Sequence, residues 1–160
     1  MTDTAPTVDH RAAIPAAPAR TGTVPTWVRV VLVALGIPNA AAGLWAVLAP
    51  SSWYDSFPGF GTPLVAAEPP YNAHLATDAG AGLLASGIVL LLAAWLADRR
   101  SVALGVIAFA AFSVPHAAYH VFNPAPGLSV ADDAQNAVLL VFTVVVSVVV
   151  LAVTGRRTAT

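Results

Sequence analysis

Four long apolar stretches constrain this chain more than any other feature of its sequence. They cover about residues 27–49, 74–97, 101–122 and 132–154. Each is long enough to cross a bilayer as a helix, which takes roughly 20 residues. Only 9% of all residues are charged, whereas soluble domains carry roughly 25%. The sequence therefore predicts an all-α, polytopic membrane protein, in which a four-helix transmembrane bundle occupies residues 26–155.

The distribution of basic residues predicts how the bundle is oriented. All seven basic residues are arginines: Arg11, Arg20, Arg29, Arg99, Arg100, Arg156 and Arg157. They fall in the N-terminal region, in the turn between the second and third stretches, and after the fourth stretch. The loops 50–73 and 123–133 contain no Arg or Lys. Because basic segments stay in the cytoplasm, both termini are expected on the cytoplasmic side of the plasma membrane.

The segments outside the apolar stretches have their own compositional signals. Residues 1–25 are rich in Ala, Pro and Thr and have no apolar period, so a disordered cytoplasmic tail is expected there. Residues 156–160 form a second, short cytoplasmic tail. The five prolines of the loop 50–73 predict that it contains no regular helix. Its interspersed aromatic residues favour an anchor on the membrane surface or, alternatively, a lid over a site below.

Small residues predict where the first two stretches approach other helices. They form a possible packing face on each stretch, because small side chains let helix backbones come close in a membrane: Gly36, Ala40 and Gly43 on the first, and Gly80, Gly82, Ser86 and Gly87 on the second. Pro38 is expected to kink the first stretch, because it lacks the N–H that a helix needs there. The neighbouring Asn39 is expected to satisfy a carbonyl group that the kink frees.

Four ionisable side chains lie in the apolar stretches, as two pairs with the same spacing. His74 and Asp78 begin the second stretch, and His116 and His120 end the third. Residues four apart share one face of a helix, and the expected topology places both pairs at matching depths in the outer leaflet. Ionisable groups in a membrane usually face the bundle interior and pair with one another. We therefore expect the four side chains to meet between the two helices.

Three interpretations of this expected site stay open. Three imidazoles and one carboxylate suit zinc, copper, iron or manganese, with His74, Asp78, His116 and His120 as ligands. Asn72, Tyr119 or Asn136 would then support the ligands. A His on each of two helices also suits axial ligation of haem b. The third interpretation is a hydrogen-bonded His–Asp network that only joins the helices.

Several function classes are excluded by composition. The chain has no Cys, which excludes disulfides, thiolate metal sites and cysteine nucleophiles. The formal net charge of −1 leaves no basic surface of the kind that binds nucleic acid.

Three runs of the chain resemble those of an uncharacterised family of four-helix integral membrane proteins from actinobacteria. They are residues 53–61 (WYDSFPGFG), 70–80 (PYNAHLATDAG) and 115–120 (PHAAYH), and the resemblance covers about residues 27–154. Ala73 stands where such relatives carry an acidic residue, so any role of that carboxylate is absent here. The architecture is also similar to that of DoxX-like membrane proteins, some of which are linked to quinone-dependent redox chemistry.

The leading functional hypothesis is a metal-dependent or redox-linked membrane protein whose His/Asp site opens to the outer leaflet. Its ligand would be a lipophilic or extracytoplasmic small molecule. The alternative is a non-enzymatic subunit or scaffold of a homo-oligomer or larger membrane complex, held by its small-residue faces. A haem b-binding membrane protein is the second alternative.

Overall fold

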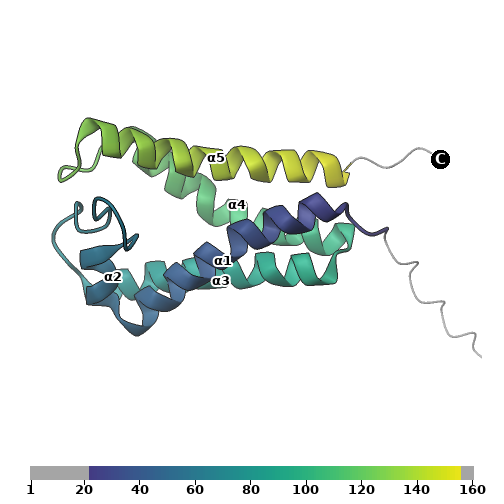
Figure 1. Cartoon of the computed structure of the whole chain (residues 1–160), viewed down its shortest axis with the longest axis horizontal. Helices are drawn as coiled ribbons and strands as arrows, with labels where there is room; N and C mark the ends of the chain where they lie inside the picture. The colour runs from purple at the N-terminus through teal and green to yellow at the C-terminus, as the bar shows by residue number, and fades with distance from the viewer. Residues whose placement is uncertain (1–21, 156–160) are drawn as a thin grey trace, which may run out of the picture.

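The computed structural model describes residues 22–155, and five helices lie within them (Figure 1). Their bounds are α1 Thr26–Leu48, α2 Pro50–Ser56, α3 Ala73–Leu96, α4 Arg99–Phe122 and α5 Val130–Gly155. The four longer helices are long and apolar enough to cross a membrane, which confirms the prediction of four such segments. The tails expected at residues 1–21 and 156–160 lie outside the described residues.

The long helices pack as two pairs, α1 with α3 and α4 with α5, and α3 also packs against α4. The start of α1, the α3–α4 turn and the end of α5 lie together at one end of the bundle, called the terminal end below (Figure 1). The opposite end, called the loop end, carries α2 and the loops 57–72 and 123–129.

At the terminal end a single apolar core joins all four long helices. Its buried side chains are Val28, Leu32, Leu90, Ala93, Ala94, Val102, Val106, Phe109 and Val150, with Val24 beside them. The last carbonyls of a helix have no partner within that helix. Two arginines supply partners here, because Arg29 Nε donates to the Ala94 carbonyl at 3.1 Å and Arg99 Nη1 donates to the Thr154 carbonyl at 3.2 Å.

Residues 22–25 differ from the expectation of a tail that is disordered up to residue 25. The Val24 N–H donates to the Ala97 carbonyl at 2.9 Å, and Thr23 pairs with Asp98 as an isolated bridge. Ala97 offers its carbonyl from a left-handed turn, with φ 54°. Composition alone missed this contact because it depends on where the α3–α4 turn lies.

The α1–α3 seam is built on glycines, as the small-residue faces predicted. An added Cβ on Gly43 would lie 2.2 Å from the Leu84 nitrogen, and one on Gly87 would lie 2.4 Å from the Ala40 nitrogen. These distances are shorter than any van der Waals contact, so only glycine permits this approach. The two helices therefore pack backbone to backbone and behave as one unit.

The helix α2 corrects the prediction that prolines keep the loop 50–73 free of regular helix. Pro50 is the first residue of α2. Proline is tolerated at that position because the N–H it lacks has no partner inside a helix anyway. The other four prolines follow the helix, and residues 57–72 contain no further helix.

The proline within α1 does not end the helix. Asn39 Nδ2 donates to the Leu35 carbonyl at 2.8 Å. The carbonyl that Pro38 deprives of its usual partner is that of Ala34, so the amide bonds the neighbouring carbonyl rather than the freed one. Asn39 thus has a local hydrogen-bonding role close to the one expected from sequence.

Candidate functional site

A pocket of about 670 Å³ lies between the two helix pairs, toward the loop end. Side chains from all five helices and from the loop after α2 line it, and most of them are apolar. The principal contributors are Pro38, Asn39, Ala42 and Trp45 of α1, Trp53 of α2, Ala79 and Leu83 of α3, Phe109, Phe112, Ser113, His116 and His120 of α4, and Asn136, Leu140 and Thr143 of α5. The pocket lies between the helix pairs toward the loop end, whereas at the terminal end the apolar core fills the space between them.

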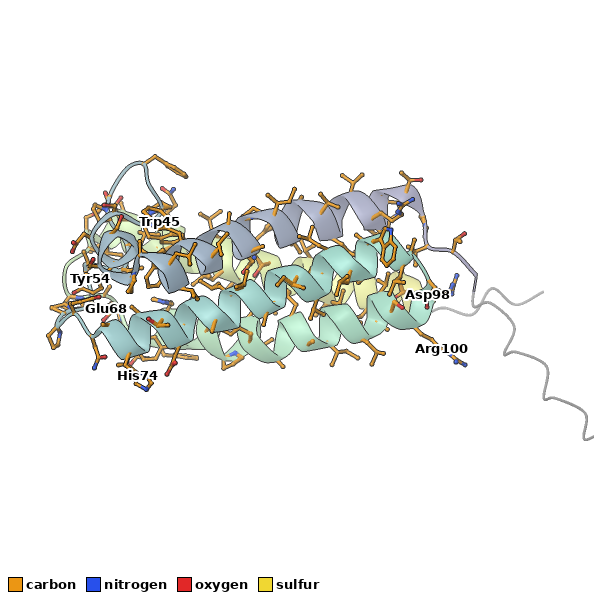
Figure 2. The ribbon with its side chains drawn as sticks, turned by 90° about the horizontal axis from the view of Figure 1, so that it is seen from below. Trp45, Tyr54, Glu68, His74, Asp98 and Arg100 are labelled. Atoms are coloured by element: carbon orange, nitrogen blue, oxygen red, sulfur yellow. The ribbon has the colours of Figure 1, made fainter. Side chains whose placement is uncertain are left out.

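The two loops contact each other at the loop end. The Gly127 N–H donates to the Ala67 carbonyl at 3.2 Å, which ties the α4–α5 loop to the α2–α3 loop. Asp133 accepts from the Ala125 N–H at 3.0 Å, and both Ala67 and Ala125 are buried. Figure 2 shows Trp45, Tyr54 and Glu68 gathered at this end, where Tyr54 Oη donates to the Glu68 carbonyl at 3.3 Å.

Three polar atoms in the pocket wall are buried and have no hydrogen-bond partner among the described residues. They are Trp53 Nε1, Ser113 Oγ and His120 Nδ1. Leaving a buried donor or acceptor unpaired costs about 1–3 kcal/mol, so such atoms are uncommon in folded proteins. Across residues 22–155 they are the only buried side-chain nitrogen or oxygen atoms in this condition, and all three belong to residues that line one pocket.

The two histidines of the pocket are held on α4 by ring contacts. His116 and His120 lie one turn apart with ring centroids separated by 4.9 Å in an edge-to-face arrangement. Phe112 stacks on His116 at 5.6 Å, and Tyr119 meets His120 edge-on at 5.5 Å. The helix continues through Pro115. These contacts hold both imidazoles as part of the pocket wall.

The other predicted pair, His74 and Asp78, lies outside the pocket. His74 Nε2 and Asp78 Oδ2 are 3.3 Å apart on α3, and their side chains are 83% and 62% exposed. Neither residue lines the pocket, and Figure 2 shows His74 pointing away from the bundle at the loop end. Within residues 22–155 no group of three or more His, Cys, Asp or Glu side chains is placed to hold a metal ion.

The expected single site of four ligands is therefore divided into two separate pairs. The spacing of four residues did predict that each pair shares a helix face. It could not fix which neighbour that face meets, because this depends on the rotation and splay of each helix. Metal binding by either pair stays a prediction.

The three residues expected to support metal ligands do not lie together at one site. Asn72 caps α3, since its Oδ1 accepts from the Leu75 N–H at 3.2 Å. Asn136 lines the pocket, and Tyr119 contacts His120.

Of the three residues with buried, unpartnered polar atoms, the sequence analysis selected His120 but not Trp53 or Ser113. Ser113 lies three residues before His116, and His120 follows at four, which is the helical spacing of one face. That pattern was visible in the sequence. Trp53 belongs to α2, which was not predicted, so nothing indicated that its indole would be buried.

Comparisons with known proteins do not assign the chain. No protein-family model, curated protein or solved structure matches it. The resemblance to actinobacterial four-helix proteins and to the DoxX-like architecture stays a prediction.

Proposed function

We propose that this chain is a multi-pass plasma-membrane protein that binds a small, largely apolar molecule in the pocket at the loop end. The observation that carries the proposal is the set of three buried, unpartnered polar atoms in one mostly apolar wall. Ligand pockets typically enclose roughly 300–1,000 Å³, and are apolar with a few placed polar groups. The cavity of about 670 Å³ has this size and composition.

The three unpartnered atoms indicate which hydrogen-bonding groups the ligand carries. An indole N–H only donates hydrogen bonds, whereas a serine hydroxyl and an imidazole nitrogen either donate or accept. A group that meets Trp53 Nε1 is therefore an acceptor, such as a carbonyl, ether or hydroxyl oxygen. Phe109, Phe112 and Leu83 line the same cavity and suit an apolar body. The ligand is thus an apolar molecule with at least one oxygen acceptor.

The proposal includes the orientation of the bundle. The seven arginines support a cytoplasmic terminal end, which places the pocket in the outer half of the membrane. Because the chain has no native Cys, single cysteines report the side directly. In intact cells a membrane-impermeant maleimide should label Thr62→Cys, which is in a loop at the loop end, but should label Thr158→Cys only after permeabilisation. The reverse pattern would overturn this orientation.

Photolabelling with benzophenone tests the binding proposal. This probe is an apolar ketone with one carbonyl acceptor, and irradiation attaches it to nearby C–H bonds. In detergent we expect the label on the segment of α4 around Ser113 and His120. Ala42→Phe, which adds a ring inside the pocket, should lower that labelling at least fivefold. The matched variant Ala108→Phe, on an exposed position of α4 outside the pocket, should leave it unchanged. Labelling that Ala42→Phe does not reduce would overturn the proposal.

A second candidate function is metal binding by His116 and His120, linked to redox or Lewis-acid chemistry on the bound molecule. The close imidazole pair and the unpartnered Nδ1 of His120 favour it, because an i, i+4 pair presents two ligands on one face. Zinc, copper, iron and manganese are the candidates. Elemental mass spectrometry of purified protein should find a stoichiometric metal that His120→Ala removes and His74→Ala retains. Protein without metal would reject this candidate and leave the pocket proposal intact.

A further inference from the structure

We infer that the ligand is a neutral amphiphile dissolved in the membrane, and that it reaches the pocket sideways between α1 and α5. This inference rests on the proposed function and adds to it the path and the chemical class of the ligand. The structure offers three ways into the pocket: through the loops, between α3 and α4, and between α1 and α5. The contacts along each of them distinguish the three.

The path through the loops is closed by direct contact. An added Cβ on Gly127 would lie 2.8 Å from the Ala67 Cα, so the two loop backbones touch. Their hydrogen bond joins them at the same point. Below them Trp53 is buried, and Phe57 packs against its ring at 5.6 Å. A molecule that enters between the two loops would have to separate these contacts.

The path between α3 and α4 is obstructed at the level of the pocket. The ring of Phe112 lies on Gly82, where an added Cβ would be 2.9 Å from the nearest ring carbon. The two helices also pack against each other and are joined by a short turn.

The third path runs between α1 and α5. These helices are not among the pairs that pack extensively, and Figure 1 shows them diverging toward the loop end. The pocket is lined on this flank by small or half-buried side chains, with Ala41 and Ala42 on α1 and Leu140 and Thr143 on α5. Because both helices are long enough to cross a membrane, this opening faces lipid rather than water.

The charges of the residues that line the pocket favour a neutral ligand. Among the described residues that line the pocket, Glu68 is the only one with a full charge, and none is Arg or Lys. An anionic headgroup would therefore have no fixed positive charge to pair with, and burying an unpaired ion is costly. A carbonyl or hydroxyl headgroup would bond to Trp53, Ser113 and His120, while its chain extends through the opening into the lipid.

Two ketone probes in phosphatidylcholine nanodiscs test this path. 4-Decylbenzophenone is neutral and partitions into the bilayer, whereas benzophenone-4-sulfonate is anionic and water-soluble. We expect the first to label the α4 segment around Ser113 and His120, and the second to label it at least tenfold less. Dominant labelling by the sulfonate would overturn both the neutral class and the lateral path.

Bulky substitutions locate the opening. Ala41→Trp narrows the α1 side, so the initial rate of labelling by the decyl probe should fall about tenfold while the endpoint after long incubation changes little. Ala118→Trp, at an exposed position of α4 outside the pocket, is the matched control and should not slow labelling. An unchanged rate in Ala41→Trp would reject the α1–α5 path. Free benzophenone labelling in detergent reports the pocket independently, so failure of the path and failure of the proposed function give different results.

Discussion

At the terminal end, side chains from all four long helices fill the space between the helix pairs, and two arginines bond the last carbonyls of neighbouring helices. At the loop end the two helix pairs border a pocket, and the loops 57–72 and 123–129 contact each other. This difference in packing indicates that the two ends have different roles. Packing at the terminal end holds the bundle together, whereas residues at the loop end line a pocket and keep buried polar atoms without partners.

The largest expected effect concerns the α1–α3 seam, which both ends share. Gly87→Val places a Cβ 2.4 Å from the Ala40 nitrogen, so the helix backbones must move apart. Overpacking costs about 1–3 kcal/mol, occasionally more, and a clash with backbone belongs at the upper end. Unfolding in dodecylmaltoside, followed by circular dichroism, should show a loss of about 3 kcal/mol. Gly155→Val, with no atom within 4 Å of its added Cβ, should change little, and equal effects would show that the seam is not close-packed.

The next prediction compares a core leucine with a pocket leucine. Leu90 is fully buried at the terminal end, and Leu140 is half-buried in the pocket wall. In lipid an unfolded helix stays in an apolar solvent, so the cost of Leu→Ala is mainly the lost packing and the new cavity. We expect Leu90→Ala to reduce the free energy of unfolding by about 1–3 kcal/mol and Leu140→Ala by less than about 1 kcal/mol. The opposite order would contradict the difference between the two ends.

A smaller effect is expected for the arginine contact at the terminal end. Arg99→Gln removes the guanidinium that donates to the Thr154 carbonyl, and one such hydrogen bond contributes about 1 kcal/mol. Amide exchange in the last turn of α5 should become faster in the same variant. Arg100→Gln is the matched control, because this neighbouring arginine is exposed. Similar changes in both variants would mean that charge alone, rather than this contact, is responsible.

The smallest expected effect on stability concerns the contact between the loops. Gly127→Ala places a Cβ 2.8 Å from the Ala67 Cα, and these surface loops can yield at a cost below about 1 kcal/mol. Acrylamide should then quench Trp53 more strongly, measured in a Trp27→Phe, Trp95→Phe background that leaves only Trp45 and Trp53. Pro126→Ala, in the same loop, should leave quenching unchanged. Quenching that is equally weak in both variants would mean that the loop contact does not shield Trp53.

The apolar stretches predicted the four helices that could span a membrane, because length and composition decide whether a segment can cross one. The glycine faces of the first two stretches were also predicted, since small residues spaced along one face of a spanning helix favour close approach of a second backbone. Residues Gly43 and Gly87 confirm this most directly, with added Cβ atoms that would meet backbone.

The arrangement of the polar residues could not be predicted to the same extent. His74 and His116 belong to neighbouring helices and were expected at matching depths, yet one points outward and the other lines the pocket. Depth follows from counting residues, whereas the direction of a side chain follows from helix rotation and splay, which depend on packing along the whole seam. Trp53 was missed for a related reason, because the burial of its indole depends on the position of α2 relative to α1 and α3.

The shared core and the arginine hydrogen bonds at the terminal end also have a mechanical consequence. Because the α1–α3 pair and the α4–α5 pair share a buried core at that end, a change in the angle between them that releases the loop contact would pivot there. A spanning helix is about 35 Å long, so a tilt of about 5° at the pivot moves its far tip by about 3 Å. Small adjustments among a few methyl groups at the terminal end would then change the width of the loop end by about 3 Å.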